Sequence, residues 1–410
     1  METYDELAAR ITKSGIITDP WLDGEPRFRV DPVTMAPGLL ATLERTAEDV
    51  AAVYHELTEL VGDEPALLAD FFGLTPAQTT MWLASQPAWH GIARADVFLT
   101  DEGPCIAELN CDTPTGEAEA VELGRVHGAA DPNRRLEARF LAMVDRFATS
   151  ELAAPPAKKT YAVVYPTELT EDLSLVRLYK SWLEARGDRV LLGSPYNLGF
   201  SDRRLTLFDE PVDVVLRHYK TDWWGERSSV WTDDRIADAA PLAGPLAAVF
   251  EALAEGTACV INPFGAVLPQ NKRSMAFMWE HIHRFSPASQ AAIEKHVPYT
   301  ARLETLHDEQ LLAQKDEWVI KSDYGAEGDE VVIGKLSTER EWRTTLRTAK
   351  RARFVGQRYF QAKAGPRGEI TNYGVFVIGG EAAGLYVREQ VGATDERALS
   401  VSVRIGSDPA

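Results

Sequence analysis

The stretch Arg94–Glu119, RADVFLTDEGPCIAELNCDTPTGEAE, decides the fold of this 410-residue chain. Two apolar runs flank the turn sequence DEGP, which is the pattern of a β-hairpin. Arg94 and Asp96 lie two apart on the first run, so their side chains face the same way on a strand. The second run repeats this spacing with Glu108 and Asn110. We therefore expect a hairpin with one strongly polar face.

This polar face has the composition of a site for magnesium and phosphate. Asp96, Glu108 and Asn110 supply two carboxylates and an amide oxygen, which are hard ligands that suit Mg²⁺ carrying nucleotide phosphates. Arg94 can place its guanidinium group on a phosphoryl oxygen. The alternative interpretation is an edge hairpin whose polar face is merely solvated. The spacing by itself leaves both interpretations open.

The composition is typical of a globular protein that does not bind nucleic acid. Hydrophobic residues make up 45% of the chain and charged residues 26%, and the length allows two or three packed domains. The formal net charge of −19 disfavours a nucleic-acid partner. It fits a cationic substrate, or it serves solubility alone. No apolar run reaches the roughly 20 residues of a membrane-spanning helix, so we expect no membrane partner.

The cysteines and the N-terminal segment indicate a cytoplasmic protein. The segment METYDELAARITKSG is acidic and amphipathic and lacks the hydrophobic region of a signal peptide. Cys105, Cys111 and Cys259 give neither a disulfide framework nor a zinc-binding spacing, as expected in a reducing compartment. The oligomeric state is left open by the sequence.

The secondary-structure pattern changes along the chain. Apolar residues recur at helical spacing from Leu39 to Leu57, and the Ala/Pro-rich segment 151–159 is the clearest linker. From Tyr161 the pattern has the βαβ rhythm of a parallel sheet. After Trp318 we expect an α+β unit of mainly antiparallel strands. The other expected helices are 65–85, 132–149, 173–185, 273–285 and 339–350, the last with a capping box of Thr338 and Glu341.

Two lysines lie where they could neutralise phosphates. Lys272 follows Asn271 at the start of an expected helix, and Lys321 is carried by an expected strand into a glycine-containing loop. A strand–loop–strand of this kind lets backbone N–H groups close over phosphates, and Gly325, Glu327 and Gly328 are its candidate binding residues. The loop is not a Walker A motif. Alternatively, Lys321 is a charged strand residue that discourages aggregation.

The last strands contain further candidates for nucleotide binding. Gln357 and Tyr359 lie on the expected strand 354–360, where the strand backbone could read an adenine base. Arg388 ends another expected strand and could reach the phosphates or the metal. The alternative for each is a cross-strand ion pair or a solvated face.

Several motifs in order along the chain resemble those of one family. The string ELNCDTPT at 108–115 resembles the E-x-N-A-D-T-P-T signature of glutathionylspermidine synthases and their synthetase-only relatives. In that family the signature follows an R-x-D strand, as here. The supporting matches run from about residue 21 to residue 389. Residues 21–28 resemble the family motif W-x-E-x3-Y-x-F, and residues 212–224 resemble the family segment that ends in tryptophan. Residues 271–272 resemble S-N-K, residues 321–328 resemble R-K-x3-G-R-E-G, and residues 387–389 resemble I-R-E.

The resemblance implies an ATP-grasp ligase of mixed α/β and α+β fold that joins a small-molecule carboxylate, amino-acid or peptide-like, to an amine. It implies three parts: 1–150 with the metal-binding hairpin, 151–260 as a Rossmann-like pre-ATP-grasp domain, and 261–410 as the ATP-grasp nucleotide-binding domain. ATP and Mg²⁺ would be required. Carried over by position, three residues would hold Mg²⁺, Arg94 would bind the transferring phosphoryl group or the acyl-phosphate oxygen, and two lysines would grip the ATP phosphates. These are Asp96, Glu108 and Asn110 for the metal, and Lys272 and Lys321 for ATP.

Departures from the family pattern keep other functions open. Cys111 replaces the usual alanine, and Ala326 replaces the loop arginine. No histidine near Cys111 in the sequence favours a thiolate, so we expect a small buried cysteine. The chain shows no amidase domain, so hydrolysis of the product is not expected from it. The rival functions are a kinase-like enzyme that stops at the phosphorylated carboxylate and a degenerate nucleotide-binding regulatory protein.

Overall fold

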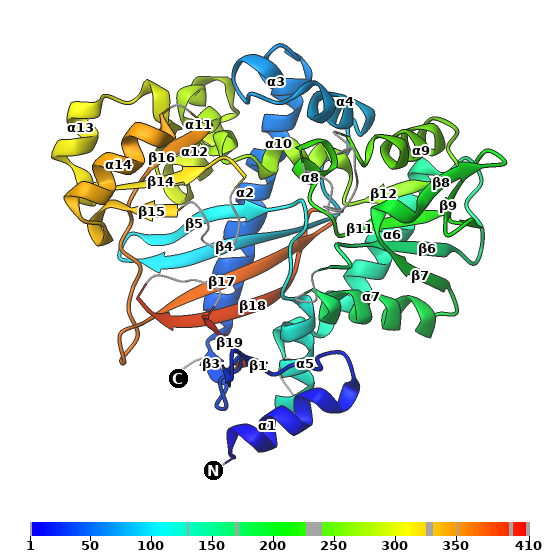
Figure 1. The fold of residues 1–410 in the computed structure, drawn as a ribbon. Helices are drawn as coiled ribbons and strands as arrows, with labels where there is room; N and C mark the ends of the chain where they lie inside the picture. Colours follow the sequence, from blue (N-terminus) through cyan, green and yellow to red (C-terminus); the bar gives the residue numbers. More distant parts are fainter. Residues whose placement is uncertain are drawn as a thin grey trace, which may run out of the picture.

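The middle sheet of the computed structural model joins strands from distant parts of the sequence (Figure 1). The structure describes residues 2–128, 131–168, 172–226, 240–324, 331–350, 352–392 and 397–406. The strand order is β19-β18-β17-β4-β5, with antiparallel neighbours. The predicted hairpin is confirmed. The strands are β4 (Ile92–Thr100), β5 (Gly103–Asn110), β17 (Glu369–Ile378), β18 (Glu381–Val391) and β19 (Leu399–Val401).

A β-bulge sets which residues of the hairpin face each other. Near the turn Val97 is the partner of Ile106, but farther along Asp96 is the partner of Glu108. Ala107 is therefore the extra residue on β5. Because a shift of one residue moves side chains to the other face of a strand, the bulge places Glu108 on the same face as Asp96.

A parallel sheet of order β12-β11-β6-β7 confirms the predicted βαβ pattern. It lies to the right of the middle sheet in Figure 1. Helix α7 (Leu173–Ala185) connects the first two of these strands along the chain. A small antiparallel sheet of order β10-β9-β8, which the sequence analysis missed, lies between β7 and β11 in the chain. The strands are β6 (Thr160–Val164), β7 (Arg189–Gly193), β8 (Leu198–Ser201), β9 (Arg204–Leu207), β10 (Glu210–Pro211), β11 (Val214–Arg217) and β12 (Cys259–Ile261).

The third sheet is antiparallel, with the order β13-β16-β14-β15, which confirms the predicted character of the last third. The capping box of Thr338 and Glu341 is confirmed at the start of α14 (Glu339–Ala349). The predicted helix 273–285 is shorter: α11 ends at Glu280 and a 3-10 turn follows. The strands are β13 (Thr300–Arg302), β14 (Trp318–Ser322), β15 (Val331–Ile333) and β16 (Phe354–Arg358).

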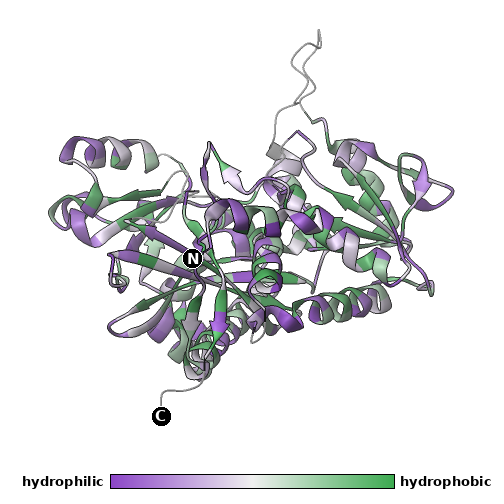
Figure 2. Ribbon diagram, turned by 90° about the horizontal axis from the view of Figure 1, so that it is seen from below, coloured by the Kyte–Doolittle hydropathy of each residue, from purple (hydrophilic) through white to green (hydrophobic). Residues whose placement is uncertain are grey.

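Helix α2 (Pro37–Gly62) covers one face of the middle sheet and confirms the predicted helical spacing. Leu43, Val50 and Leu57 are fully buried in the core against this sheet. Figure 2 shows that helices carry hydrophobic and hydrophilic residues on different sides, as the amphipathic pattern requires.

The remaining helices connect the sheets. The predicted helix 65–85 is two helices, α3 and α4, because the chain turns between them at Gly73, where φ is +64°. They are α3 (Leu67–Asp70), α4 (Pro76–Ala84), α5 (Glu117–His127), α6 (Leu136–Glu151), α8 (Thr221–Glu226), α9 (Ala243–Ala254), α10 (Val267–Gln270), α11 (Arg273–Glu280), α12 (Pro287–His296) and α13 (Asp308–Ala313). Short 3-10 turns occupy 12–14, 132–135, 195–197, 264–266, 282–284, 303–305, 315–317 and 334–336.

A strand near the N-terminus pairs with the last described strand of the chain. Strand β3 (Val33–Met35) pairs in parallel with β20 (Val403–Ile405), and helix α1 (Tyr4–Ile11) leads into the small hairpin of β1 (Trp21–Leu22) and β2 (Glu25–Pro26). In the described part of the chain, no helix has both the length and the apolar character needed to span a bilayer. The division at residues 150 and 260 stays a prediction; the middle sheet takes strands from both sides of that division.

Candidate functional site

The polar face of the hairpin opens into a cavity of about 1580 Å³. The cavity is bordered by the middle sheet, by β14, β15 and β16 of the third sheet, by the N-terminal hairpin, and by residues after the parallel strands. Eight predicted site residues line it: Arg94, Asp96, Glu108, Asn110, Lys321, Gln357, Tyr359 and Arg388. Lys272 reaches the site through Glu108. Gly325, Glu327 and Gly328 lie outside the described residues.

Asp96 holds two arginines in place. Its Oδ1 accepts a hydrogen bond of 2.7 Å from Nε of Arg94, and its Oδ2 accepts from Arg94 at 3.1 Å and from Arg388 at 3.2 Å. Burial would raise the pKa of Asp96, but the two guanidinium groups outweigh it and hold the pKa below its usual value. Asp96 therefore remains a carboxylate that fixes both cations.

Asn372 on β17 is a member of this cluster that the sequence analysis missed. Its amide nitrogen donates to Oδ2 of Asp96 at 3.3 Å, and its amide oxygen is buried without a hydrogen-bond partner among the described residues. Asn372 is also the cross-strand partner of Arg388. The available signal was a polar residue just before the apolar run 373–378, but nothing in the sequence tied this segment to β4.

Glu108 is surrounded by positive charge. Its Oε2 lies 3.4 Å from Nζ of Lys272, and its Oε1 accepts from Asn110 at 3.3 Å. Burial would raise the pKa of Glu108, but Lys272 and Lys321 lower it below its usual value, while Asp96 acts in the opposite direction. Burial lowers the pKa of Lys321 to about 8, although Glu108 opposes this shift. Nζ of Lys321 donates to the carbonyl oxygen of the bulge residue Ala107 at 3.3 Å.

The donor set fits a magnesium ion that also binds phosphate. Among the described residues, no group of three or more His, Cys, Asp or Glu side chains could hold a metal. The oxygens available are two carboxylates and the amides of Asn110 and Asn372, with one buried amide oxygen lacking a partner. Mg²⁺ usually takes one or two carboxylates and completes its coordination with substrate phosphates and water. Asp96 is the more constrained ligand, because Arg94, Arg388 and Asn372 already bind its oxygens.

The predicted adenine-binding residues border the cavity, with some polar groups already paired. The side-chain amide of Gln357 donates to Oγ1 of Thr300 at 3.1 Å, and the N–H of Tyr359 donates to the carbonyl of Glu317 at 2.8 Å. A base bound here would therefore contact other atoms of this segment. Adenine recognition by Gln357 and Tyr359 stays a prediction.

The loop after β5 is held by two amide side chains that the sequence analysis missed. Oε1 of Gln270 accepts from the N–H groups of Cys111 and Asp112 at 2.9 and 3.1 Å. The side chain of Asn262 accepts from the backbone N–H of Gly91 and Ile92 and donates to three carbonyls, those of residues 92, 111 and 112. The sequence signal for Asn262 was that it is a polar residue directly after a buried strand, β12. These contacts attach the loop to the parallel sheet.

The carboxyl ends of the parallel strands face the same cavity. The strand order reverses between β6 and β11, the place where sheets of this type bind ligands. Asp172, Ser174, Glu119 and Asp222 line the cavity there. Asp172 lies 2.9 Å from Nε2 of His218. Burial would raise the pKa of Asp172, but His218 outweighs it and lowers the pKa. The cavity thus has a second polar wall, apart from the cluster of Asp96, Glu108 and their cations.

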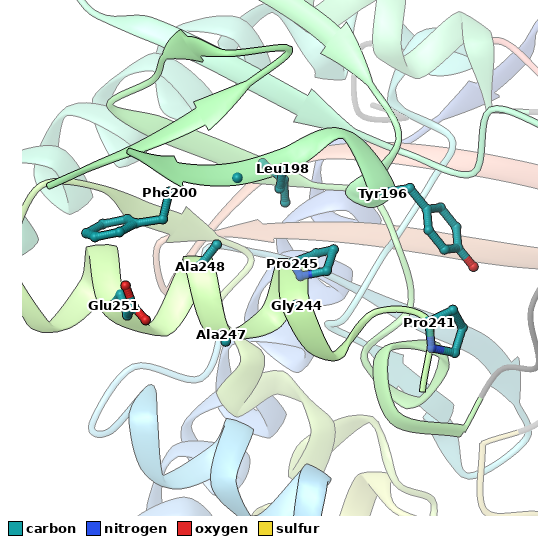
Figure 3. A pocket seen from close by; sticks show the side chains of 10 residues that line it. Tyr196, Leu198, Phe200, Pro241, Gly244, Pro245, Ala247, Ala248 and Glu251 are labelled. Carbon is teal, nitrogen blue, oxygen red and sulfur yellow. The ribbon is translucent and has the colours of Figure 1, made fainter. Parts of the chain in front are cut away.

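A smaller cavity of about 480 Å³ lies between β8 and α9 (Figure 3). Its walls are mostly apolar or small residues such as Leu198, Phe200 and Ala248, and Glu251 is the one charged side chain among the described residues that line it. The described lining brings no group of charged residues together, so it does not compete as the reactive site.

Comparison with known proteins decides the family. The sequence model of the family described as "Glutathionylspermidine synthase preATP-grasp" matches residues 34–405. The chain belongs to this family. The predicted mixed α/β and α+β fold, with an ATP-grasp part and a pre-ATP-grasp part, is thereby confirmed. No curated protein sequence matches the chain.

Solved structures share the fold of this family member at low sequence identity. A glutathione synthetase-like effector from Globodera pallida, solved in the apo form, superposes with a TM-score of 0.60 at 11% identity, covering 99% of this chain and 98% of that one. A putative γ-glutamylcysteine synthetase from Methylobacillus flagellatus gives a TM-score of 0.50 at 14% identity, covering 90% of this chain and 87% of that one.

Proposed function

We propose that this family member is an ATP- and Mg²⁺-dependent carboxylate–amine ligase that forms an amide bond and releases ADP and phosphate. One observation carries the proposal: Asp96 and Glu108 are direct cross-strand partners at a cavity, surrounded by Arg94, Arg388, Lys272 and Lys321. Two anionic groups among four cations suit phosphoryl transfer, which depends mostly on positioning and charge neutralisation.

The residues take the following roles in the proposal. Lys272 and Lys321 neutralise ATP phosphates, while Arg94 and Arg388 orient the transferring phosphoryl group. Asp96, Glu108 and Asn110 hold Mg²⁺, with the amide oxygen of Asn372 as a further candidate ligand. When bound, the metal supplies positive charge to the phosphates. Asp96 also fixes the directions of both arginines before substrate binds.

The reaction has two bond exchanges. An oxygen of the carboxylate attacks the γ-phosphorus of ATP, ADP leaves, and an acyl phosphate forms. The amine then attacks the acyl carbon, phosphate leaves, and the amine nitrogen loses a proton. No protein nucleophile is needed. Cys111 is fully buried and burial raises the pKa of its thiol, so it is unsuited to that role.

In this proposal the carboxylate and the amine bind at the second polar wall of the cavity, at the carboxyl ends of the parallel strands. We propose a carboxylate of amino-acid or peptide-like kind, because the structural relatives carry the names of glutathione and γ-glutamylcysteine synthetases. The cavity exceeds the roughly 300–1,000 Å³ of common ligand pockets and so has room for more than the nucleotide. Free Cys105, Cys111 and Cys259 fit a reducing compartment such as the cytoplasm.

The test is ADP release with MgATP against a panel of carboxylates, each with and without a pool of amines. ADP release that requires both partners, with a product mass equal to their condensation, is the expected result. ADP release with the carboxylate alone would replace the ligase by the kinase-like enzyme. Nucleotide binding without ADP release on any pair would favour a degenerate binding protein. The same assay compares the variant Glu108→Gln with a matched control. The control is Glu102→Gln, because Glu102 lies at the exposed turn of the same hairpin.

A further inference from the structure

The basic run Arg217-His218-Tyr219-Lys220 begins at the last residue of β11, and the proposed chemistry gives Arg217 no role. Its side chain is fully buried at the carboxyl end of β11. Nε donates to the carbonyl of Asn262 at 2.9 Å and Nη1 to the carbonyl of Tyr219 at 2.7 Å. Nη2 donates to Oδ1 of Asp112 at 2.5 Å. A buried guanidinium group with this many fixed acceptors has one orientation.

Asp112 links Arg217 to the loop that follows the metal-binding strand. Besides Arg217, its carboxylate accepts from the N–H of Thr221 at 2.7 Å and from the hydroxyl of Thr221 at 2.6 Å. Both oxygens are therefore bound to the segment after β11. The carboxylate that the sequence places in the signature loop is turned toward the parallel sheet.

The two ends of this loop belong to the reactive cluster. At one end, Asn110 donates to Glu108. At the other, the carbonyl of Thr115 accepts from Nη1 of Arg94 at 2.7 Å. The next residue, Gly116, has φ +104° and leaves no room for a side chain, since a Cβ there would lie 2.3 Å from the ring of Tyr386. A loop fixed in its middle thus determines where Arg94 and Asn110 lie.

We propose that Arg217 is a positioning residue: through Asp112 it fixes the loop 111–115 and thereby the orientation of Arg94 and Asn110. The inference rests on the proposed function for its effect on turnover. Arg217 does not line the cavity, so it acts without touching substrate. Displacement of a reacting group by about 1 Å is enough to lower a rate by about a hundredfold.

The test compares Arg217→Gln, Asp112→Asn and the milder Thr221→Val with a control on β9, whose ion pair reaches the residue before β11. The control is Arg204→Gln, because Arg204 forms an ion pair of 2.6 Å with Asp213, which precedes β11. We expect kcat to fall about a hundredfold for Arg217→Gln and Asp112→Asn. The KM for ATP should change less than about threefold, and Arg204→Gln should retain kcat. An equal loss of kcat in Arg204→Gln would overturn the proposal, since it would show a general structural effect.

A second readout does not need turnover. The N–H groups of Cys111 and Asp112 donate to Gln270, so their hydrogen exchange reports on the loop. We expect exchange at least about tenfold faster in Arg217→Gln and Asp112→Asn than in Arg204→Gln. Faster exchange in a protein that turns over no substrate pair would support the loop's dependence on Arg217 while rejecting the ligase. If Arg217→Gln does not fold, kcat and hydrogen exchange of Thr221→Val test the proposal instead, because this substitution removes only a single hydroxyl group. Unchanged kcat and unchanged exchange in Thr221→Val and Asp112→Asn would overturn the inference.

Discussion

Arg94 lies directly against Gly374 of the neighbouring strand. A Cβ atom at Gly374 would lie 2.8 Å from Cδ of Arg94 and 3.0 Å from the carbonyl oxygen of Tyr386. We therefore predict that Gly374→Ala displaces Arg94 and lowers kcat by about 10–100-fold, while the protein stays folded. Gly244→Ala in α9, where nothing lies within 4 Å of the added methyl group, should keep full activity. Steady-state kinetics and circular dichroism of both variants check this prediction. If Gly374→Ala is as active as Gly244→Ala, Arg94 has no role in the mechanism.

The proposed metal site depends on Glu108. We predict that Glu108→Ala abolishes turnover and leaves the thermal unfolding midpoint nearly unchanged, because this side chain is partly exposed and faces cations rather than the core. The measurement is ADP release over a range of Mg²⁺ concentrations. Unchanged turnover would refute the assignment of Glu108.

The thiol of Cys111 is predicted to be dispensable. Its sulfur is buried, and its weak contact with the carbonyl of Ala266 is 3.8 Å long. Cys111→Ala should retain most of the activity and lose on the order of 1 kcal/mol of stability from the lost burial. Activity assays and urea unfolding test this, and a complete loss of turnover in a folded variant would instead favour a covalent mechanism.

Glu117 at the start of α5 makes the stability depend on pH. Its side chain is fully buried, one oxygen accepts from the hydroxyl of Tyr179 at 3.1 Å, and the other lacks a hydrogen-bond partner. Burial raises the pKa of Glu117 from 4.5 to about 7. Below pH 4.5 the group is protonated in both the folded and the unfolded chain. Between pH 4.5 and 7 the unfolded chain loses its proton first, so this group's contribution to stability falls as the pH rises.

We predict that Glu117→Gln removes this loss, which is on the order of 3 kcal/mol above pH 7. The free energy of unfolding in urea, measured from pH 4.5 to 8, should decline less steeply in Glu117→Gln than in the parent protein. Glu137→Gln, an exposed position on α6, is the control and should follow the parent. Parallel curves for Glu117→Gln and the parent would show that the pKa of this carboxyl is the same in the folded and the unfolded chain, and would refute the prediction.

The sequence predicts the local elements well, and the reasons are local. Hydrophobic spacing places α2, the turn sequence places the β4–β5 hairpin, and the capping box of Thr338 places the start of α14. The family motifs single out Lys272 and Lys321 as candidates for binding ATP phosphates, and the structure brings both close to Glu108.

The relations that depend on distant parts of the chain were not predictable. The bulge at Ala107 comes from the register of the hairpin, and no residue type announces it. Asn372 reaches Asp96 only because β17 pairs with β4, a contact between remote segments, and the pairing of β18 with β17 brings the predicted candidate Arg388 to the same carboxylate. Asn262 and Arg217 act through hydrogen bonds to Cys111 and Asp112, which lie in the loop after β5. Such networks follow from tertiary packing, which local patterns do not contain.

The pairing of β4 with β17 also bears on how the protein is made. A ribosome releases the hairpin long before it has synthesised β17, so the growing chain exposes the backbone of β4 as an open sheet edge. Asp96 has neither Asn372 nor Arg388 until the last strands emerge. Sheets closed by such distant segments fold slowly, because loop closure must precede the stabilising contacts. The edge of β4 that β17 covers therefore stays unpaired until nearly the whole chain has been made.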